Sequence, residues 1–208
     1  RLLTSRGGAD AGWLDALEAT MAEKGVAIAA ARLDMAGRLA GQLEAAGDGP
    51  FPAADLAVEG EAEAWLAEGS ALDAEDRLKQ AFKDARGRDG EIGRTAHGPH
   101  RSDLYVEYKS RGRPAADCST GEQKALLISL VLAQARLQAA ERGRAPILLL
   151  DEVAAHLDAD RRAALFDEIL RLGLQAWMTG TDADLFQPLA GRAAMFHVAD
   201  AGLALGDP

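Results

Sequence analysis

The chain of 208 residues has a single cysteine, few aromatic residues and no long apolar run. One thiol, Cys118, excludes an internal disulfide framework and a thiolate metal cluster. No segment approaches the roughly 18 consecutive apolar residues of a membrane helix, and the first residues lack the apolar core of a signal peptide. With 48% hydrophobic and 27% charged residues, we expect a folded cytoplasmic protein that does not associate with membranes.

An initiator methionine is also missing, and Arg1 stands only a few residues before a helical pattern. We therefore expect the chain to be a fragment of a longer protein, whose N-terminal part lies upstream. A chain of this length can bury one substantial core or two small ones.

Positive charge is scarce and concentrated in the middle of the chain. The net charge of -10 divides into -10 for residues 1–76 (5 basic, 15 acidic), +5 for residues 77–113 (10 and 5) and -5 for residues 114–208 (8 and 13). A local basic stretch can still bind phosphates, because screening over about 8 Å keeps distant acidic residues from cancelling it. The candidates for contacts with DNA phosphates are Lys79, Lys83, Arg86, Arg88, Arg94, Arg101, Lys109, Arg111 and Arg113. A merely solvated charged face stays open as the alternative, since no series of aromatic residues accompanies the stretch.

The first hundred residues are predicted to be mainly helical. Apolar residues recur at helical spacing over residues 10–46, which indicates a long helix, or a helical pair interrupted at Gly25. Glycine and proline within residues 47–52 end this pattern. The further elements expected here are a strand at 56–58, a helix at 72–86, a loop at 87–99 and a strand at 104–108.

After Gly121, helical patterns alternate with apolar strand patterns. The expected elements are a helix to residue 142, a strand at 147–150, a helix at 159–171, a strand at 175–178, a short helix at 183–189 and a strand at 194–198. This alternation predicts an α/β fold with a mostly parallel sheet covered by helices on both faces. We expect a helical lobe with a short strand over residues 1–100 and an α/β head over residues 101–208.

The first motif that could bind a ligand lies at the start of the helix expected from Gly121. Ser119-Thr120-Gly121-Glu122 fits a capping box, in which Ser119 accepts from a first-turn amide and Glu122 reaches back. The same residues fit a phosphate site, because unpaired amides at a helix N-terminus attract anions. A glycine at position 121 would let a ligand approach the backbone. The two interpretations are compatible.

The second motif is the acidic pair Asp151-Glu152, which follows the strand expected at 147–150. Two carboxylates at the end of a strand that is buried on both faces cost free energy unless a cation or another positively charged group binds beside them. Ligands of open α/β sheets bind at this edge, where Asp151 can hold Mg²⁺ while Glu152 orients and deprotonates a water. Capping of the next turn by the pair is the alternative. A metalloprotease helix is excluded, because the sequence has no His-Glu-x-x-His pair.

The order of these motifs resembles that of the ABC-type ATPase head. The resemblance implies that Ser119 to Glu122 is the signature motif, which reaches the γ-phosphate of an ATP held by the opposing subunit. It implies that 147–151 is Walker B, with Asp151 as the Mg²⁺ ligand, and that Glu152 is the catalytic glutamate. Residues 155–158, ending at Asp158, stand at the D-loop.

Two positions depart from the ABC pattern. Thr181 stands where many ABC proteins have the switch histidine, and a threonine can donate a hydrogen bond but cannot shuttle charge as histidine does. Thr120 replaces the first of the two usual glycines, so this loop is stiffer.

A third segment narrows the resemblance to one ABC family. Gly98-Pro99-His100-Arg101, together with Ser119 to Lys124, resembles the bacterial RecF recombination-mediator ATPases over essentially the whole chain. The resemblance implies an ATP-dependent homodimer that binds gapped DNA or single/double-strand junctions and works with RecO- and RecR-like proteins in loading RecA. His100 and Arg101 have a structural alternative, in which they tie the strand at 104–108 to the head.

The printed sequence has no P-loop of the type G-x-x-x-x-G-K-[ST], which would cradle the ATP phosphates. We therefore expect these 208 residues alone neither to bind ATP tightly nor to hydrolyse it. The alternatives in function are a non-catalytic module for dimerisation and partner docking, and the nucleotide-binding part of a transporter or of an SMC-like ATPase. The long helical segment and Gly98 to Arg101 disfavour a transporter, and the absence of sustained heptads disfavours an SMC arm.

Overall fold

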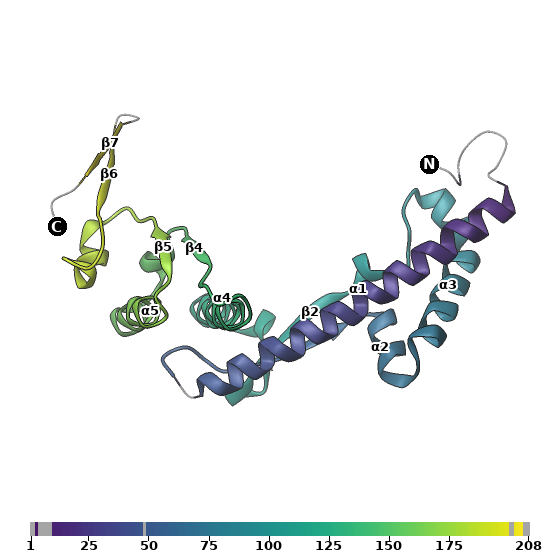
Figure 1. The fold of residues 1–208 in the computed structure, drawn as a ribbon, viewed down its shortest axis with the longest axis horizontal. Helices are drawn as coiled ribbons and strands as arrows, with labels where there is room; N and C mark the ends of the chain where they lie inside the picture. The colour runs from purple at the N-terminus through teal and green to yellow at the C-terminus, as the bar shows by residue number, and fades with distance from the viewer. Residues whose placement is uncertain (1–2, 4–9, 48, 200–201, 206–208) are drawn as a thin grey trace. The chain divides into compact units, whose positions relative to one another are not determined.

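The computed structural model describes residues 3, 10–47, 49–199 and 202–205 (Figure 1). Its contacts divide the chain into two compact units that interleave along the sequence. Unit 1 comprises residues 1–41, 54–108 and 112–115, and unit 2 comprises residues 42–53, 109–111 and 116–208. Among the described residues, no helix combines the length and the apolar character needed to cross a membrane.

Residues Ala11–Ala46 form one continuous helix, α1, rather than a helical pair. Asp10 caps its start, since Oδ1 accepts from the amides of Gly12 at 2.6 Å and Trp13 at 3.2 Å. Gly25 does not interrupt the helix. A Cβ at this position would stand 2.8 Å from Cδ2 of Leu78, so the glycine permits close packing within unit 1.

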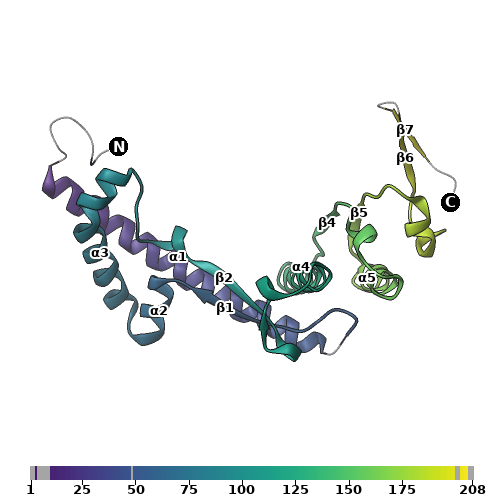
Figure 2. The same cartoon turned by 180° about the vertical axis from the view of Figure 1, so that it is seen from behind.

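The core of unit 1 forms between α1 and two further helices, α2 (Glu61–Glu68) and α3 (Ala71–Ile92). Figure 2 shows both helices beside α1. The buried side chains are Ala22, Val26, Ala74, Leu78 and Phe82, with Trp65 and Leu66 packed against them. Leu78 and Phe82 lie on the buried side of α3.

The helix α3 is longer than the sequence indicates, and the predicted loop at 87–99 is wrong over its first part. Gly87 and Gly90 lie within the helix, which ends at Gly93 in the left-handed conformation (φ 76°). The buried carboxylate of Asp89 accepts from the amide of Ala96 at 3.1 and 3.2 Å. This contact fixes the chain after the helix and offsets the low helical propensity of the two glycines.

A three-stranded antiparallel sheet completes unit 1. Strand β1 (Ala54–Glu59) pairs with β2 (Asp103–Tyr108), and β2 pairs with β3 (Arg113–Pro114). The strands predicted at 56–58 and 104–108 are thus confirmed and pair with each other.

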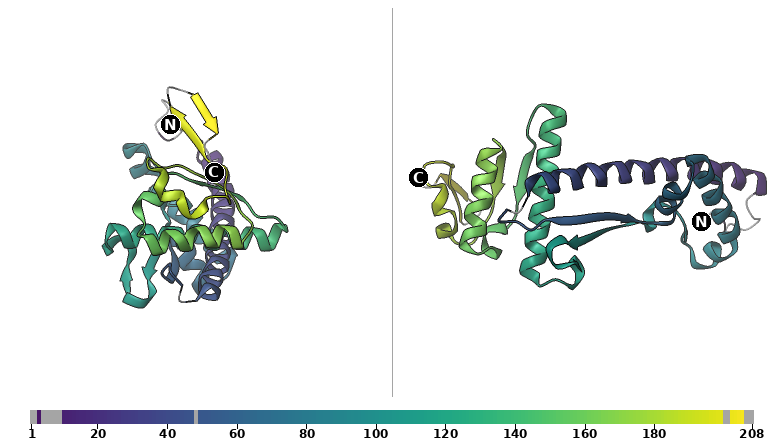
Figure 3. Two further views of the ribbon diagram at one scale, coloured as in Figure 1. Left: turned by 90° about the vertical axis from the view of Figure 1, so that its left-hand side faces the viewer. Right: turned by 90° about the horizontal axis from the view of Figure 1, so that it is seen from below.

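Unit 2 contains the α/β part of the chain. Its helices α4 (Thr120–Arg142) and α5 (Ala159–Arg171) lie side by side on the same side of β4 (Ile147–Leu150) and β5 (Gln175–Met178) (Figures 1 and 3). The two strands are parallel, with Leu150 paired to Met178. The described 3₁₀ segments that lie wholly or partly in this unit are η2 (Lys109–Arg111), η3 (Ala115–Asp117), η4 (Val153–His156) and η5 (Ala183–Leu189). The core consists of Ile128, Leu132, Ala135, Leu148, Ala154, Leu157, Leu165, Phe166, Ile169, Leu174, Phe186 and Leu189.

One face of this sheet is exposed, so the expectation that the strand at 147–150 is buried on both faces is wrong within this chain. Leu148 is buried, whereas Ile147 is 60% and Leu149 78% exposed, and Trp177 on β5 is 54% exposed. Strand β6 (Phe196–Ala199) pairs with β7 (Gly202–Leu205) in a separate antiparallel hairpin. The sequence predicted the first of these strands but not the second.

Candidate functional site

The start of α4 is a capping box, as predicted. Ser119 Oγ accepts from the amide of Glu122 at 3.4 Å, and Glu122 Oε2 accepts from the amide and hydroxyl of Ser119 at 2.8 Å each. Arg111 forms an ion pair with the other carboxylate oxygen of Glu122. The Glu122 carboxylate therefore organises the helix start.

The residues at this helix start leave the backbone accessible. Ser119, Thr120 and Gly121 are exposed, and a Cβ built at Gly121 would have no atom within 4 Å. The first amides of a helix have no partner in the helix itself, and its N-terminus carries partial positive charge. This arrangement can receive a phosphate, in addition to its capping role.

The acidic pair lies where the parallel strands β4 and β5 end. Thr179, the residue after β5, donates from Oγ1 to Asp151 Oδ1 at 2.5 Å. The same oxygen accepts from the amide of Glu152 at 2.9 Å. The amide of Thr179 donates to the carbonyl of Leu150 at 3.1 Å and continues the ladder between the strands. Asp151, Glu152 and Thr179 thus form one hydrogen-bonded cluster at the carboxyl edge of the sheet.

Glu152 has an uncommon backbone conformation. With φ 49° and ψ 19° it lies in the left-handed region, and no other non-glycine residue in the described part of the chain has a positive φ. For a residue with a Cβ this conformation costs roughly 1–2 kcal/mol. Such strain persists where surrounding contacts impose it, and it is concentrated at functional sites.

The other residues assigned by resemblance take local structural positions. Asp158 is the N-cap of α5, where Oδ1 accepts from the amide of Arg161 at 2.8 Å and Oδ2 lies 3.5 Å from the Arg161 guanidinium. Thr181 is exposed and makes no hydrogen bond to any residue that the structure describes. The adjacent Asp182 caps η5 by accepting from the amide of Asp184 at 2.9 Å.

Thr179 is the residue of this cluster that sequence reasoning missed. The signal was available, because Thr179 follows a strand parallel to β4, and polar residues after neighbouring parallel strands meet at one edge. The resemblance drew attention to Thr181 instead. In the structure the hydroxyl that contacts Asp151 is two residues earlier in the chain.

A magnesium ion would fit this edge only with help from a ligand. Among the described residues, no three His, Cys, Asp or Glu side chains gather closely enough to hold a metal. Mg²⁺ is commonly bound through one or two carboxylates, with substrate phosphates and waters completing its shell. Asp151 is exposed and meets that requirement.

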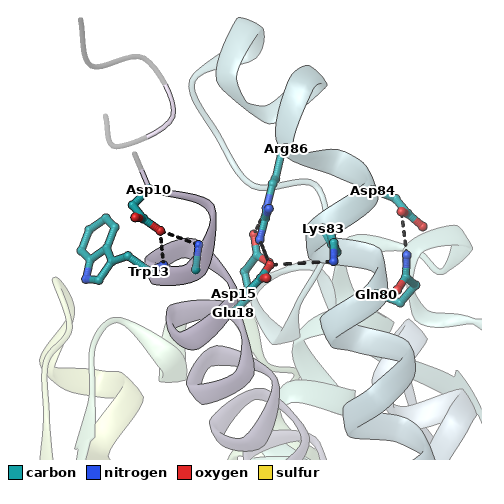
Figure 4. Close-up of polar contacts among 9 residues, drawn as sticks. Asp10, Trp13, Asp15, Glu18, Gln80, Lys83, Asp84 and Arg86 are labelled. Atoms are coloured by element: carbon teal, nitrogen blue, oxygen red, sulfur yellow. Dashed lines mark hydrogen bonds and ion pairs between the residues drawn. The ribbon is translucent and has the colours of Figure 1, made fainter. Parts of the chain in front are cut away.

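Some basic side chains of the stretch at 77–113 form ion pairs within unit 1. Arg86 on α3 donates to Glu18 at 2.7 and 2.5 Å and to Asp15 at 2.5 Å, and Lys83 lies 4.0 Å from Asp15 (Figure 4). The hydrogen bond from Arg86 lowers the pKa of Asp15, and the bonds to Glu18 and then Asp15 raise the pKa of Arg86. Arg86 therefore stabilises the contact between α1 and α3.

The remaining basic candidates differ in their partners. Lys79, Arg88, Arg94 and Arg101 are exposed and form no ion pair with a described residue. Arg111 is paired with Glu122, and Lys109 and Arg113 also interact within the chain. The first four are consequently the candidates available for phosphate groups.

Curated relatives match nearly the whole chain. It is 52% identical over 199 residues to the DNA replication and repair protein RecF of Mesorhizobium japonicum, a match that covers 95% of this chain and 52% of that protein. Over nearly all of its length the chain is therefore similar to part of the RecF proteins. RecF proteins of Brucella abortus and Caulobacter vibrioides are each 53% identical over 197 residues, covering 94% of this chain and 51% of theirs. The chain spans about half the length of these curated relatives.

Two solved RecF structures share the fold. The recombination mediator protein RecF-ATPrS of the RecFOR pathway matches with a TM-score of 0.76 at 21% identity, covering 98% of this chain and 54% of that one. The RecF-ATP structure of the same pathway matches with a TM-score of 0.68 at 19% identity, covering 94% and 52%. The predicted α/β fold is thereby confirmed. No protein-family model matches the chain.

Proposed function

We propose that these 208 residues are the C-terminal half of a RecF-type ABC ATPase that acts in recombinational DNA repair. The observation that carries the proposal is the cluster at the carboxyl edge of β4 and β5, where Thr179 joins Asp151 to the backbone of Glu152. In this proposal Asp151 holds Mg²⁺ beside the ATP phosphates, and Glu152 orients and deprotonates the attacking water. Unit 1 would correspond to the helical lobe and unit 2 to the head.

The other half of the ATP pocket would come from a part of the protein outside this chain. The relatives are about twice as long as the chain, and the exposed apolar side chains Ile147, Leu149 and Trp177 are suited to packing against further structure. The P-loop would belong to that other half. The isolated 208 residues are therefore expected to show no ATP turnover, whereas turnover by them would contradict this division.

The two motifs of unit 2 would serve different nucleotides. Asp151, Glu152 and Asp158 would act with the ATP bound by their own chain, while Ser119, Thr120 and Gly121 would contact the γ-phosphate of the ATP bound by a second subunit. The accessible helix start at Gly121 supports this role. Thr181 would stand at the switch position, where it can donate a hydrogen bond but cannot carry charge.

The proposed partners follow from the family. Lys79, Arg88, Arg94 and Arg101 would contact the backbone of gapped or junction DNA without reading its sequence. The solved neighbours are named as recombination mediators of the RecFOR pathway, which supports RecO- and RecR-like proteins as partners here. ATP-dependent dimerisation on DNA would place RecA on the exposed single strand.

The Glu152→Gln variant of the full-length protein tests the proposed ATPase. An amide keeps the size of the side chain but cannot accept the proton of the attacking water. We expect ATP hydrolysis to fall by about 10²-fold or more, while ATP still binds and an ATP-bound dimer accumulates in size-exclusion chromatography.

The alternative, a non-catalytic module for dimerisation and docking, predicts a different result. In that case Glu152→Gln would change neither the nucleotide turnover nor the oligomeric state. The variant Glu141→Gln, in the last turn of α4, removes one carboxylate in the same way and provides a matched control.

A further inference from the structure

We propose that Thr179 is a positioning residue for ATP hydrolysis, which orients the Asp151 carboxylate and fixes the backbone turn that presents Glu152. The inference rests on the proposed function and adds to it a residue outside the assigned ABC motifs. Thr179 would touch neither ATP nor the attacking water, and would act through the two acidic residues beside it.

The hydroxyl of Thr179 makes hydrogen bonds with both of these neighbours. A threonine hydroxyl has one proton to donate and can accept a hydrogen bond at the same time. Here the proton goes to Asp151 Oδ1 at 2.5 Å, and the oxygen accepts from the Glu152 amide at 2.9 Å. One atom therefore fixes both the side chain of Asp151 and the main chain of Glu152.

The bond to Asp151 leaves the second oxygen of this carboxylate available. Oδ2 of Asp151 makes no hydrogen bond to any described residue, whereas Oδ1 is held by Thr179. A metal-ligating carboxylate is usually oriented by such a bond to its other oxygen, which keeps the ligating oxygen in one direction. Thr179 would perform this function for the Mg²⁺ ligand.

The bond to Glu152 supports an unfavourable turn. Glu152 lies in the left-handed region at φ 49°, and its amide donates to Thr179 Oγ1 at 2.9 Å. The turn leads directly into η4, where Ala154 is buried in the core of unit 2. The position of the Glu152 side chain is thus set by a backbone conformation that Thr179 helps to hold.

Thr179 itself is placed by regular structure. Its amide bonds to the carbonyl of Leu150 at 3.1 Å, one step beyond the pairing of Leu150 with Met178. A β-branched side chain on such a backbone has a restricted χ1 angle. The end of β5 therefore holds this hydroxyl beside the turn that follows β4.

The experiment compares Thr179→Val, Thr179→Ser and Thr20→Val in the full-length protein. Valine keeps the shape and removes the hydroxyl, and serine restores the hydroxyl. Thr20 is exposed on α1 in unit 1, where its hydroxyl donates to the carbonyl of Ala16 and to no other described residue. It therefore provides a threonine-to-valine control away from the site.

Two quantities are measured: the rate of ATP hydrolysis, and the binding of Mn²⁺ in the presence of a non-hydrolysable ATP analogue, followed by electron paramagnetic resonance. Loss of an outer-shell partner of a metal ligand typically costs about 10- to 100-fold in affinity or activity. We expect Thr179→Val to lose about tenfold or more in both, Thr179→Ser to recover most of the loss, and Thr20→Val to match the wild type.

The wild type and Glu152→Gln, assayed in parallel, separate this inference from the proposed function. If the wild type hydrolyses ATP and Glu152→Gln does not, the ATPase is established independently of Thr179. In that situation, wild-type Mn²⁺ binding and turnover in Thr179→Val would overturn the positioning role. Equal losses in the serine and valine variants would overturn it as well, because the hydroxyl would then be irrelevant.

Discussion

Glu168 on α5 is held between two arginines. Its carboxylate accepts from Arg171 at 2.7 and 2.8 Å and from Nε of Arg136 on α4 at 2.8 Å. The hydrogen bonds from Arg171 are the largest cause that lowers the pKa of Glu168 to about 2, burial opposes them, and Arg136 adds to the lowering. The link from Arg136 joins α4 to α5, so this one carboxylate helps to fix the two helices that support the sheet.

This triad predicts a loss of stability in acid. Because the pKa of Glu168 is lower in the folded protein than its ordinary 4.5, its stabilising effect is complete above about pH 4.5 and is lost as the pH falls toward 2. The difference corresponds to an upper limit on the order of 3 kcal/mol. In Glu168→Gln, the unfolding free energy from fluorescence-monitored denaturation should fall less steeply between pH 5 and 3 than in the wild type. The same slope in both proteins would contradict the assignment.

Among the elements that the structure describes, two helices begin with a capping box of the same kind. Ser119 begins α4 with Glu122, and Ser70 begins α3 with Asp73, where the amide of Asp73 donates to Ser70 Oγ at 3.1 Å. The hydrogen bonds from Ser70 lower the pKa of Asp73. Only the box at Ser119 belongs to the proposed nucleotide site. A comparison of the two serines can therefore distinguish the effect of helix capping from that of phosphate binding.

Alanine at either serine should destabilise the protein by about 1 kcal/mol, because each substitution removes one helix cap. Only Ser119→Ala is expected also to lower ATP hydrolysis, by about tenfold for one lost hydrogen bond to a charged group. Unfolding curves and steady-state turnover of the two variants provide the comparison. Equal turnover in both would reduce Ser119 to a helix cap.

The elements of unit 2 were predictable because their signals are strong and local. The helix at 159–171 and the strands at 147–150 and 175–178 follow from clear periodicity and occur with the predicted bounds. In unit 1, Gly87 and Gly90 gave a loop signal that the long-range packing of α3 overrides. Helix α2 was not predicted, since its eight residues fall below the length at which helical periodicity is distinctive.

The candidate site was predictable in part. The capping box at Ser119 and the location of Asp151 and Glu152 at a strand end follow from local sequence. The contact from Thr179 could not be read from local sequence, because it joins residues 28 positions apart and depends on the register of two parallel strands. The partners of Arg86 likewise lie about 70 residues away along the chain.

In the whole molecule, the proposed assembly divides the residues around each nucleotide between two subunits. Ser119 and Gly121 at the start of α4 would complete the site of a second subunit, whereas Asp151 and Glu152 would complete the site of their own chain. Each ATP would then be enclosed by residues from two copies. Neither motif could support hydrolysis without the opposing copy.

Mixing two inactive full-length variants tests this claim directly. Ser119→Arg blocks the helix start, and Glu152→Gln removes the base, so each homodimer should be inactive. In a mixed dimer both lesions fall on one ATP, and the second site is assembled from intact residues of both copies. Random association therefore predicts a return to about a quarter of the wild-type turnover in an equimolar mixture. If Ser119 and Glu152 act on the same ATP within one chain, the mixture will stay as inactive as either variant alone.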